Sequence, residues 1–364
     1  MKLAYKYRAY PKGDAANNAA IMLWRCRTLY NIALAQRIYE YKYNQRKLSA
    51  QGKKENSQYI LVKRTGGVDG MEWLGLENVP IRVLQNVLIR LQRAYENFFR
   101  RVKEGSEKPG FPRFAGSRNY NSVTYDLCNG KPSCWSLSGD RLTLGNIGVF
   151  RMKLHRPWSG RIKTVTLTRE NDQWYVCLSC DDVVVEAMPK TGKALGLYIQ
   201  RPWYGITSEG RFITEPKWYR LAEAGLAQRQ RVVSRRSKGS RRRNKARLLL
   251  AKYHAHIASQ RRDYIENYST RLLCEYDTIV INKLALKEEV AIESDSEENK
   301  ATLDNGWGMF IARLKQKAEQ YGKSVIETDL EKIQVNRDMT PVEVAEFLQG
   351  RCVPSDVTSA THIG

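Results

Sequence analysis

The chain has 364 residues, of which 61 are Lys or Arg and 38 are Asp or Glu, so its formal net charge is +23. This charge argues against an ordinary metabolic enzyme and indicates a polyanionic partner, nucleic acid before membrane. The sequence contains no run of about 18 apolar residues, no signal peptide, and seven scattered cysteines. We therefore expect a cytoplasmic protein without disulfides and without a membrane partner.

The N-terminal third combines one strand with long helices. Apolar and basic residues alternate over 1–12, which is the period of a half-buried strand. From Asp14, a good N-cap residue, apolar residues recur every three or four positions, and a second helix begins near Pro80 with an apolar stripe that reaches Val102. The pattern predicts a helical module over 13–114.

The rest of the chain changes pattern twice. From about 120 to 185 it reads as short alternating strands, a small all-β unit that the first strand could join. The region 191–330 has strands at 194–199 and 278–281 and a helix at 307–321, in a mixed α/β order.

Two stretches near the C-terminal end lack a clear pattern. Residues 288–304 are acidic and Ser-rich, which predicts a mobile loop. Residues 331–364 have weak periodicity, and we expect a short C-terminal tail with one short helix around 342–348.

A strongly basic segment runs through the helical sequence at 219–275. Its centre, 229–247, contains ten Arg or Lys and no acid, whereas surface helices normally intersperse acids that limit repulsion one turn apart. Arg dominates, and its planar guanidinium suits phosphate oxygens. We interpret the segment as a nucleic-acid surface rather than a solvated face. The predicted contacts are Arg229, Arg231, Arg235, Arg236, Lys238, Arg241, Arg242, Arg243, Lys245, Arg247, Arg261 and Arg262.

Other reactive side chains form no recognisable site. Cys177 and Cys180 have the spacing of a metal or redox pair, but residues three apart on a strand face opposite sides. His254 and His256 lie two apart on a helix, so their side chains diverge. We expect core thiols and no metal site.

Four long stretches of the chain are similar to one known family. They are the opening YKYRAYP with the downstream LYNIAL, the helix and loop that start PIRVLQNVLIRLQ, the basic helices that start LAQRQRVVSRR, and DNGWGMFIARLKQ. They resemble TnpB (OrfB), the transposon-encoded RNA-guided nuclease family. The resemblance implies a guide RNA and double-stranded target DNA as partners, a monomer on one RNA, and a bacterial protein that is nucleoid-associated when bound to DNA.

The resemblance also implies a fold and a surface that reads DNA. The fold is a helical recognition domain (13–114) inserted in a wedge β-barrel (1–12 and 115–190), followed by an RNase H-like (RuvC-like) domain over 191–330. A short motif beside the target would be read from the second long helix and the loop after it. The residues that match are Arg82 and Gln85, which can pair with guanine and adenine edges, and the weaker candidates Asn121 and Ser122. Gln85 as a mere polar surface residue remains an open alternative.

The chain departs from this family at the three carboxylates that cut DNA. Two divalent ions about 4 Å apart clamp the attacking and leaving oxygens, and they need anionic ligands. The family's first Asp falls on Tyr198 in GLYIQRPWYGITSEG, and its second acid falls on Asn282 in IVINKL. Its third Asp follows a zinc site of four cysteines, whereas this sequence has only Cys352 after ETDLEKIQVNRDMTPVEVAEFLQG.

Loss of the acids beside an intact basic segment resembles the nuclease-dead repressors of this family, the TldR proteins. We therefore expect RNA-guided DNA binding that represses transcription without cutting, by a RuvC-like domain truncated before the zinc finger, with neither zinc nor catalytic magnesium. Two alternatives stay open. One is an active endonuclease whose metal ligands have moved to acids such as Glu275 or Asp277; the other is a guide-independent, transposon-associated DNA-binding protein.

Overall fold

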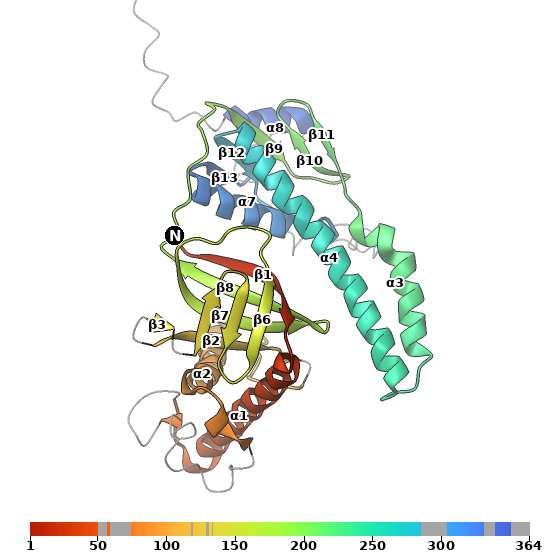
Figure 1. Ribbon diagram of the computed structural model, residues 1–364. Coiled ribbons are helices and arrows are strands. Elements are labelled where there is room, and N and C mark those ends of the chain that lie inside the picture. Colours follow the sequence, from red (N-terminus) through yellow and green to blue (C-terminus); the bar gives the residue numbers. More distant parts are fainter. Residues whose placement is uncertain are drawn as a thin grey trace, which may run out of the picture. The chain divides into compact units, whose positions relative to one another are not determined.

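The computed structural model describes residues 1–49, 57–58, 74–117, 119–128, 131–132, 134–284, 304–330 and 339–350, and Figure 1 labels their elements. The chain divides into two compact units, Met1–Val184 and Val185–Gly364. The division places residues 185–190 in the second unit, whereas the family resemblance implies that they belong to the wedge β-barrel. Among the described residues, no helix is long and apolar enough to cross a membrane.

The first unit is built on an eight-stranded antiparallel sheet that curls into a nearly closed barrel (Figure 1). β1 (Leu3–Pro11) pairs with both β6 and β8, which confirms that the first strand joins the later β region. Alternate side chains of the strands, such as Tyr7, Phe150 and Val176, fill the interior. The other strands are β2 (Ser122–Cys128), β3 (Lys131–Pro132), β4 (Trp135–Ser138), β5 (Arg141–Leu144), β6 (Gly148–Lys153), β7 (Arg161–Glu170) and β8 (Gln173–Asp181).

Two long helices follow β1 and precede β2 in the chain. They are α1 (Ala15–Asn44) and α2 (Ile81–Lys103), with a short 3-10 turn, η4 (Leu76–Asn78), before α2. Asp14 occupies the N-cap of α1, but its side chain makes no capping hydrogen bond. The apolar stripe predicted for α2 is buried only as far as Leu91, and Val102 is 49% exposed.

The second unit contains a five-stranded sheet in the order β11-β10-β9-β12-β13. β9, β10 and β11 form an antiparallel meander, whereas β12 and β13 run parallel to β9. Parallel neighbours need long connections, and the helices predicted between them are present. The elements are β9 (Ala194–Tyr198), β10 (Trp203–Thr207), β11 (Phe212–Thr214), α3 (Trp218–Ser234), α4 (Arg241–Glu275), β12 (Thr278–Asn282), α7 (Trp307–Tyr321) and β13 (Ser324–Thr328).

Helices cover both faces of this sheet. Leu195, Leu197 and Ile281 point to a core that is shared with α4 and α7. Gly196 points the other way, and a Cβ built on it would lie 1.7 Å from the carbonyl oxygen of Ala345 in α8 (Pro341–Gly350). The helix predicted near 342–348 is therefore present, and it packs directly on the strand instead of belonging to a loose tail.

Candidate functional site

Tyr198 and Asn282, the two positions that the family resemblance assigns to nuclease acids, lie at one edge of the second sheet. β9, β12 and β13 are parallel, so their carboxyl ends meet there. Tyr198 is the last residue of β9, Asn282 is the last residue of β12, and Asp329 directly follows β13. This edge is where a divalent-ion site would have to be built from those strands.

Asn282 joins two of these strand ends. Its side chain is buried; the Oδ1 atom accepts a hydrogen bond from the Ile199 N–H at 2.7 Å, and the Nδ2 atom donates to the Ile199 carbonyl at 3.0 Å. Both backbone groups of Ile199 are thereby satisfied just beyond the end of β9. A carboxylate could accept from the N–H but could not donate to the carbonyl. The amide at this position is therefore a structural clamp.

The donor set at this edge does not fit a pair of divalent ions. It consists of a phenol, an amide engaged with backbone, and the Asp329 carboxylate, which pairs with the Lys283 ammonium at 3.4 Å. Mg²⁺ and similar ions bind through several anionic oxygens. Throughout the described ranges, no group of three or more His, Cys, Asp or Glu side chains could hold a metal ion.

The alternative acids lie at the opposite edge of the sheet. Glu275 and Asp277 precede β12, whereas Asn282 ends it. Five residues of strand span roughly 16 Å, four times the separation of about 4 Å in a two-metal site. Neither acid can therefore share ions with the Tyr198 edge.

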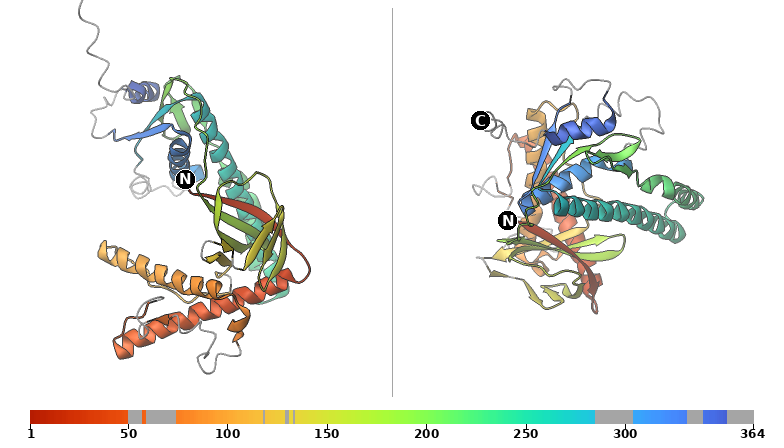
Figure 2. Two further views of the ribbon diagram at one scale, coloured as in Figure 1. Left: turned by 60° about the vertical axis from the view of Figure 1, so that its left-hand side comes forward. Right: turned by 90° about the horizontal axis from the view of Figure 1, so that it is seen from above.

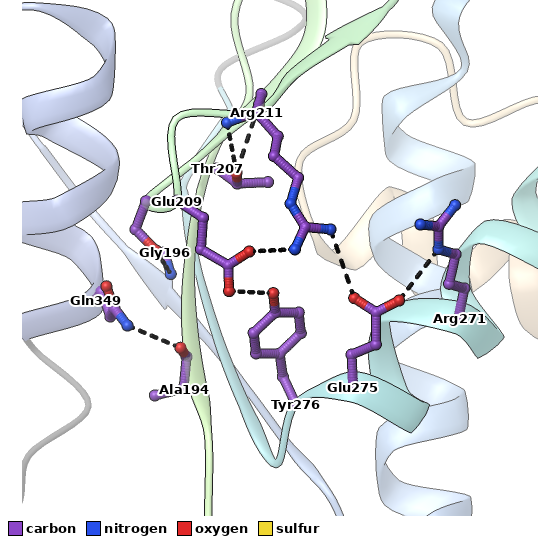
Figure 3. Close-up of polar contacts among 10 residues, drawn as sticks. Ala194, Gly196, Thr207, Glu209, Arg211, Arg271, Glu275, Tyr276 and Gln349 are labelled. Carbon is purple, nitrogen blue, oxygen red and sulfur yellow. Dashed lines mark hydrogen bonds and ion pairs between the residues drawn. The ribbon is translucent and has the colours of Figure 1, made fainter. Parts of the chain in front are cut away.

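Glu275 is also engaged in an ion-pair network (Figure 3). It lies 3.1 Å from Arg271 and 3.8 Å from Arg211, and Arg211 lies 2.6 Å from Glu209. Glu209 accepts a hydrogen bond from the Tyr276 hydroxyl. Burial and this hydrogen bond raise the pKa of Tyr276 to about 12. The arrangement balances the acids with cations and is structural.

Asp277 holds the start of the second unit against β12. Its carboxylate accepts hydrogen bonds from the Lys323 ammonium and from the backbone N–H groups of Thr191 and Gly192. Lys323 and these backbone groups hold the pKa of Asp277 well below its usual range. The structure therefore gives no support to a metal site that has moved to Glu275 or Asp277.

The basic segment forms a helical hairpin. α3 and α4 are antiparallel and extend away from the sheet of their unit (Figure 1 and the right-hand view of Figure 2). The helices are joined by residues 235–240, and the Ser240 hydroxyl caps α4 by accepting from the Arg243 N–H at 3.1 Å. The predicted helical stretch at 219–275 is thus two helices, and the Arg-rich centre occupies the tip.

Most of the predicted phosphate contacts are exposed on this hairpin. Three are partly buried and have internal partners: Arg229 lies over the Tyr253 ring at 3.9 Å, Arg243 donates to the Arg236 carbonyl at 3.3 Å, and Arg261 pairs with Asp304. The exposed members are Arg231, Arg235, Arg236, Lys238, Arg241, Arg242, Lys245, Arg247 and Arg262.

Arg261 has an acidic partner within its own unit. Its guanidinium lies 2.6 Å from the carboxylate of Asp304, which is 5% exposed and also accepts from the Tyr219 N–H. Arg261 balances this buried charge, and its contact with nucleic acid stays a prediction. The sequence predicts Asp304 in the mobile acidic loop, whereas its side chain is buried. Residues 288–303 of that loop lie outside the described residues.

The candidate DNA-reading residues lie along the surface shared by α2 and β2. The Arg82 guanidinium donates to Gln85 Oε1 at 3.4 Å. Arg90, about 12 Å farther along the helix, donates to the carbonyl and hydroxyl of Ser122 at 3.3 and 3.2 Å. Asn121 precedes Ser122, so the two predicted pairs mark different parts of this surface. Arg90, which connects the helix to β2, was not predicted.

Cys177 and Cys180 lie on β8, and His254 and His256 lie on α4. Cys180 is buried and Cys177 half-buried on opposite faces of β8, and burial raises the pKa of both thiols. His254 and His256 are exposed on α4. Cys352 lies outside the described residues.

Comparisons with known proteins decide the family. The family model OrfB_IS605, described as "Probable transposase", matches residues 205–293. A protein of Streptomyces pristinaespiralis named "Putative RNA-guided DNA endonuclease" is 30% identical over 334 residues, which cover 90% of this chain and 78% of the relative. The chain belongs to the OrfB (TnpB) family.

Further similarities of this OrfB-family chain are more distant. The "Putative RNA-guided DNA endonuclease InsQ" of Escherichia coli (strain K12) is 25% identical over 337 residues, 89% of this chain and 79% of the relative. A chain in the cryo-EM structure of the Cas12f1-sgRNA-target DNA complex matches with a TM-score of 0.43 and 10% identity, over 86% of this chain and 72% of that one. A family model named "Helix-turn-helix domain" matches residues 1–46, which here form β1 and one uninterrupted helix.

Sequence reasoning missed two structural features of this OrfB-family protein. The Asn282 clamp depends on a partner 83 positions away, so no local pattern indicates it. The Arg229–Tyr253 stack joins two helices across the hairpin. The helical periods of α3 and α4, taken together as an antiparallel pair, could have indicated it.

Proposed function

We propose that this protein binds DNA under the guidance of an RNA and represses transcription without cutting. Two relatives are named RNA-guided DNA endonucleases, and the exposed arginines at the hairpin tip supply a phosphate-binding surface. The observation that carries the loss of cleavage is the Asn282 clamp beside Tyr198. Where cleavage needs carboxylates, this chain uses an amide to hold its own backbone.

The strand order supports an RNase H-like (RuvC-like) reading of the second unit. An antiparallel meander, β11-β10-β9, continues into two parallel strands, β12 and β13. In the first unit, the helices inserted after β1 would be the recognition module, and the barrel would be the wedge. Both assignments are part of the proposal.

The proposed mechanism requires only that the protein hold the guide RNA in place and contact the nucleic-acid backbone with positive charge. The guide RNA is held by the basic hairpin and pairs with one DNA strand, while Arg82 and Gln85 read a short motif beside the target. An RNA–DNA heteroduplex is about as stable as the DNA duplex that it replaces, so backbone contacts from Arg and Lys tip the balance. The resulting R-loop excludes RNA polymerase. The partners are one guide RNA and double-stranded DNA, with one protein on each RNA and neither zinc nor catalytic magnesium.

The second candidate is an active RNA-guided endonuclease, which the names of both relatives favour. The two candidates share the guide RNA and the target and differ only in strand scission. One experiment separates them. The protein is purified with its co-purifying RNA, the RNA is sequenced, and a duplex matching its guide portion is incubated with the complex and Mg²⁺. We expect retarded migration with both strands intact, and no retardation of a duplex with a scrambled target.

Guide-dependent nicking in that assay would overturn the repressor proposal. Equal binding to matched and scrambled duplexes would instead favour a guide-independent DNA-binding protein. Repression itself is tested in cells with a reporter whose promoter contains the matched target. We expect reporter expression to fall without loss of the reporter DNA.

A further inference from the structure

The α3–α4 hairpin contains a groove of about 850 Å³. Part of its lining is apolar and therefore cannot bind phosphate. Its wall includes apolar side chains, and arginines and lysines surround them. Val232 and Leu249 are 41% and 54% exposed there. The residues that matter below are Arg229, Val232, Arg236, Arg242, Leu249 and Tyr253.

The groove arises from the way in which the two helices pack. Near the sheet, Leu226 and Ile257 are buried between them and draw the helices together. Gly225 leaves room for the Tyr253 side chain, since a Cβ there would lie 2.7 Å from the Tyr253 hydroxyl. Toward the tip the residues become Arg and Lys, which cannot bury their charges, so Val232 and Leu249 stay partly open to solvent.

A flat cationic surface lies in the groove. The Arg229 guanidinium stacks over the Tyr253 ring at 3.9 Å and donates to the Gly225 carbonyl at 3.0 Å. The hydrogen bond fixes the plane of the guanidinium, so little side-chain entropy remains to be lost when another flat group stacks on it. Aromatic rings and arginine planes are the surfaces on which proteins stack unpaired bases.

The occupant must be anionic and must also carry a flat apolar group. Residues 224–262 contain no Asp or Glu, so the surrounding charge has one sign. A bare phosphate would leave Val232 and Leu249 uncovered, and an acidic peptide would leave the Arg229–Tyr253 plane unused. A nucleotide meets both requirements, and the volume lies in the range of roughly 300–1,000 Å³ that small-ligand sites occupy.

We infer that the groove holds one unpaired nucleotide of the guide RNA. Its base packs on Val232, Leu249 and the Arg229–Tyr253 stack, and its phosphates face Arg236 and Arg242. This inference rests on the proposed function. It adds that the protein recognises the secondary structure of the guide RNA, because only an unpaired base can enter the groove.

The test separates base contacts from phosphate contacts. Val232→Ser with Leu249→Ser removes the apolar wall at two exposed positions without changing charge. Leu221→Ser is the matched control, since Leu221 is 83% exposed on the same α3 and does not line the groove. We expect the double variant to bind guide RNA about 10-fold more weakly with an unchanged dependence of affinity on salt, because no phosphate contact is lost. The control should match the wild type.

Chemical probing of the RNA bases supplies the second readout. In the wild-type complex one unpaired base should be protected at its pairing edge, and the double variant should expose that base while other protections persist. If the double variant keeps wild-type affinity and protection, the groove is not a base site and the inference fails, although RNA guidance stands. If an acidic peptide competes at the groove and no base is protected, the ligand is a protein. Failure of the wild type to bind any RNA would instead sink the proposed function.

Discussion

Asn282 and Ile199 are 83 positions apart in the sequence and share two hydrogen bonds, one in each direction between the amide side chain and the backbone. The pair ties the carboxyl end of β12 to the chain that leaves β9. Asn is suited to this role because it carries a donor and an acceptor on one planar group. The same position cannot serve both as this clamp and as a carboxylate ligand.

The first prediction concerns the stability of this clamp. Asn282→Asp leaves the Ile199 carbonyl without its donor and buries a carboxylate against it, which should cost about 2–3 kcal/mol of unfolding free energy at pH 7. Burial and the carbonyl raise the pKa of that carboxyl in the folded state, so the loss should be smallest at low pH and grow as pH rises. Urea unfolding at pH 4 and pH 8 measures this, with Gln200→Glu as an exposed control in the same unit.

The second prediction concerns the introduction of carboxylates at Tyr198 and Asn282, at the carboxyl ends of β9 and β12. Tyr198→Asp with Asn282→Glu should still bind target DNA and still not cut it, because the one further acid described at this edge, Asp329, is paired with Lys283, and the glutamate breaks the clamp. Two ions without a full set of anionic ligands repel each other. Gel assays with guide, target and Mg²⁺ test this. Cleavage by the revertant alone would mean that Asp329, or Asp338 outside the described residues, supplies the third ligand.

The third prediction uses Asp277. Because Lys323 and two backbone N–H groups hold its pKa below the unfolded value, its contribution to stability is full above about pH 5 and is lost as pH falls below about 4. Asp277→Asn should therefore be less stable than the wild type near neutral pH, and the difference should shrink in acid. Asp263→Asn, at an exposed position on α4, should show no such trend. A constant difference across pH would contradict this role.

The fourth prediction separates DNA reading from DNA positioning. Arg82→Ala and Gln85→Ala should each relax the preference for the motif beside the target, by ~1–3 kcal/mol for each lost base contact. Arg90→Ala removes the contacts to Ser122 and should weaken binding to every motif alike. Binding assays over a library of motifs distinguish the two patterns. A uniform loss for Arg82→Ala would make it a backbone contact.

The fifth prediction concerns the hairpin tip. Arg235, Arg236, Arg241 and Arg242 are exposed, and replacing all four by Ala should flatten the log–log dependence of RNA affinity on salt by roughly three units, at ~0.7–0.9 per phosphate. Replacement by Lys keeps the charges and should keep most of the slope. An unchanged slope in the Ala variant would mean that the tip is a solvated surface.

The elements could be predicted where periodicity was strong, and long-range relationships could not. Helix 307–321 and strand 278–281 appear as the pattern indicates, because their apolar faces are continuous and buried. Arg261 looked like another exposed cation, since the charge run beside it gives no sign of Asp304 more than forty positions later. Tyr198 and Asn282 could be chosen as site positions only through the family resemblance. The hydrogen bonds between Asn282 and Ile199 could be found only in the three-dimensional structure.

Gly196 and α8 have a consequence for how the second unit is made. The helix lies on β9 at that glycine, and Gln349 donates to the Ala194 carbonyl at 2.9 Å across 155 positions of the chain. The ribosome synthesises β9 well before α8, so the face of β9 that α8 covers stays exposed to solvent until α8 has been made. The α3–α4 hairpin depends on contacts close in sequence and can form early. The nascent chain therefore presents the hairpin that we propose binds RNA before the unit that carries the hairpin is closed. The proposed capture of guide RNA and the folding of this unit can then overlap in time.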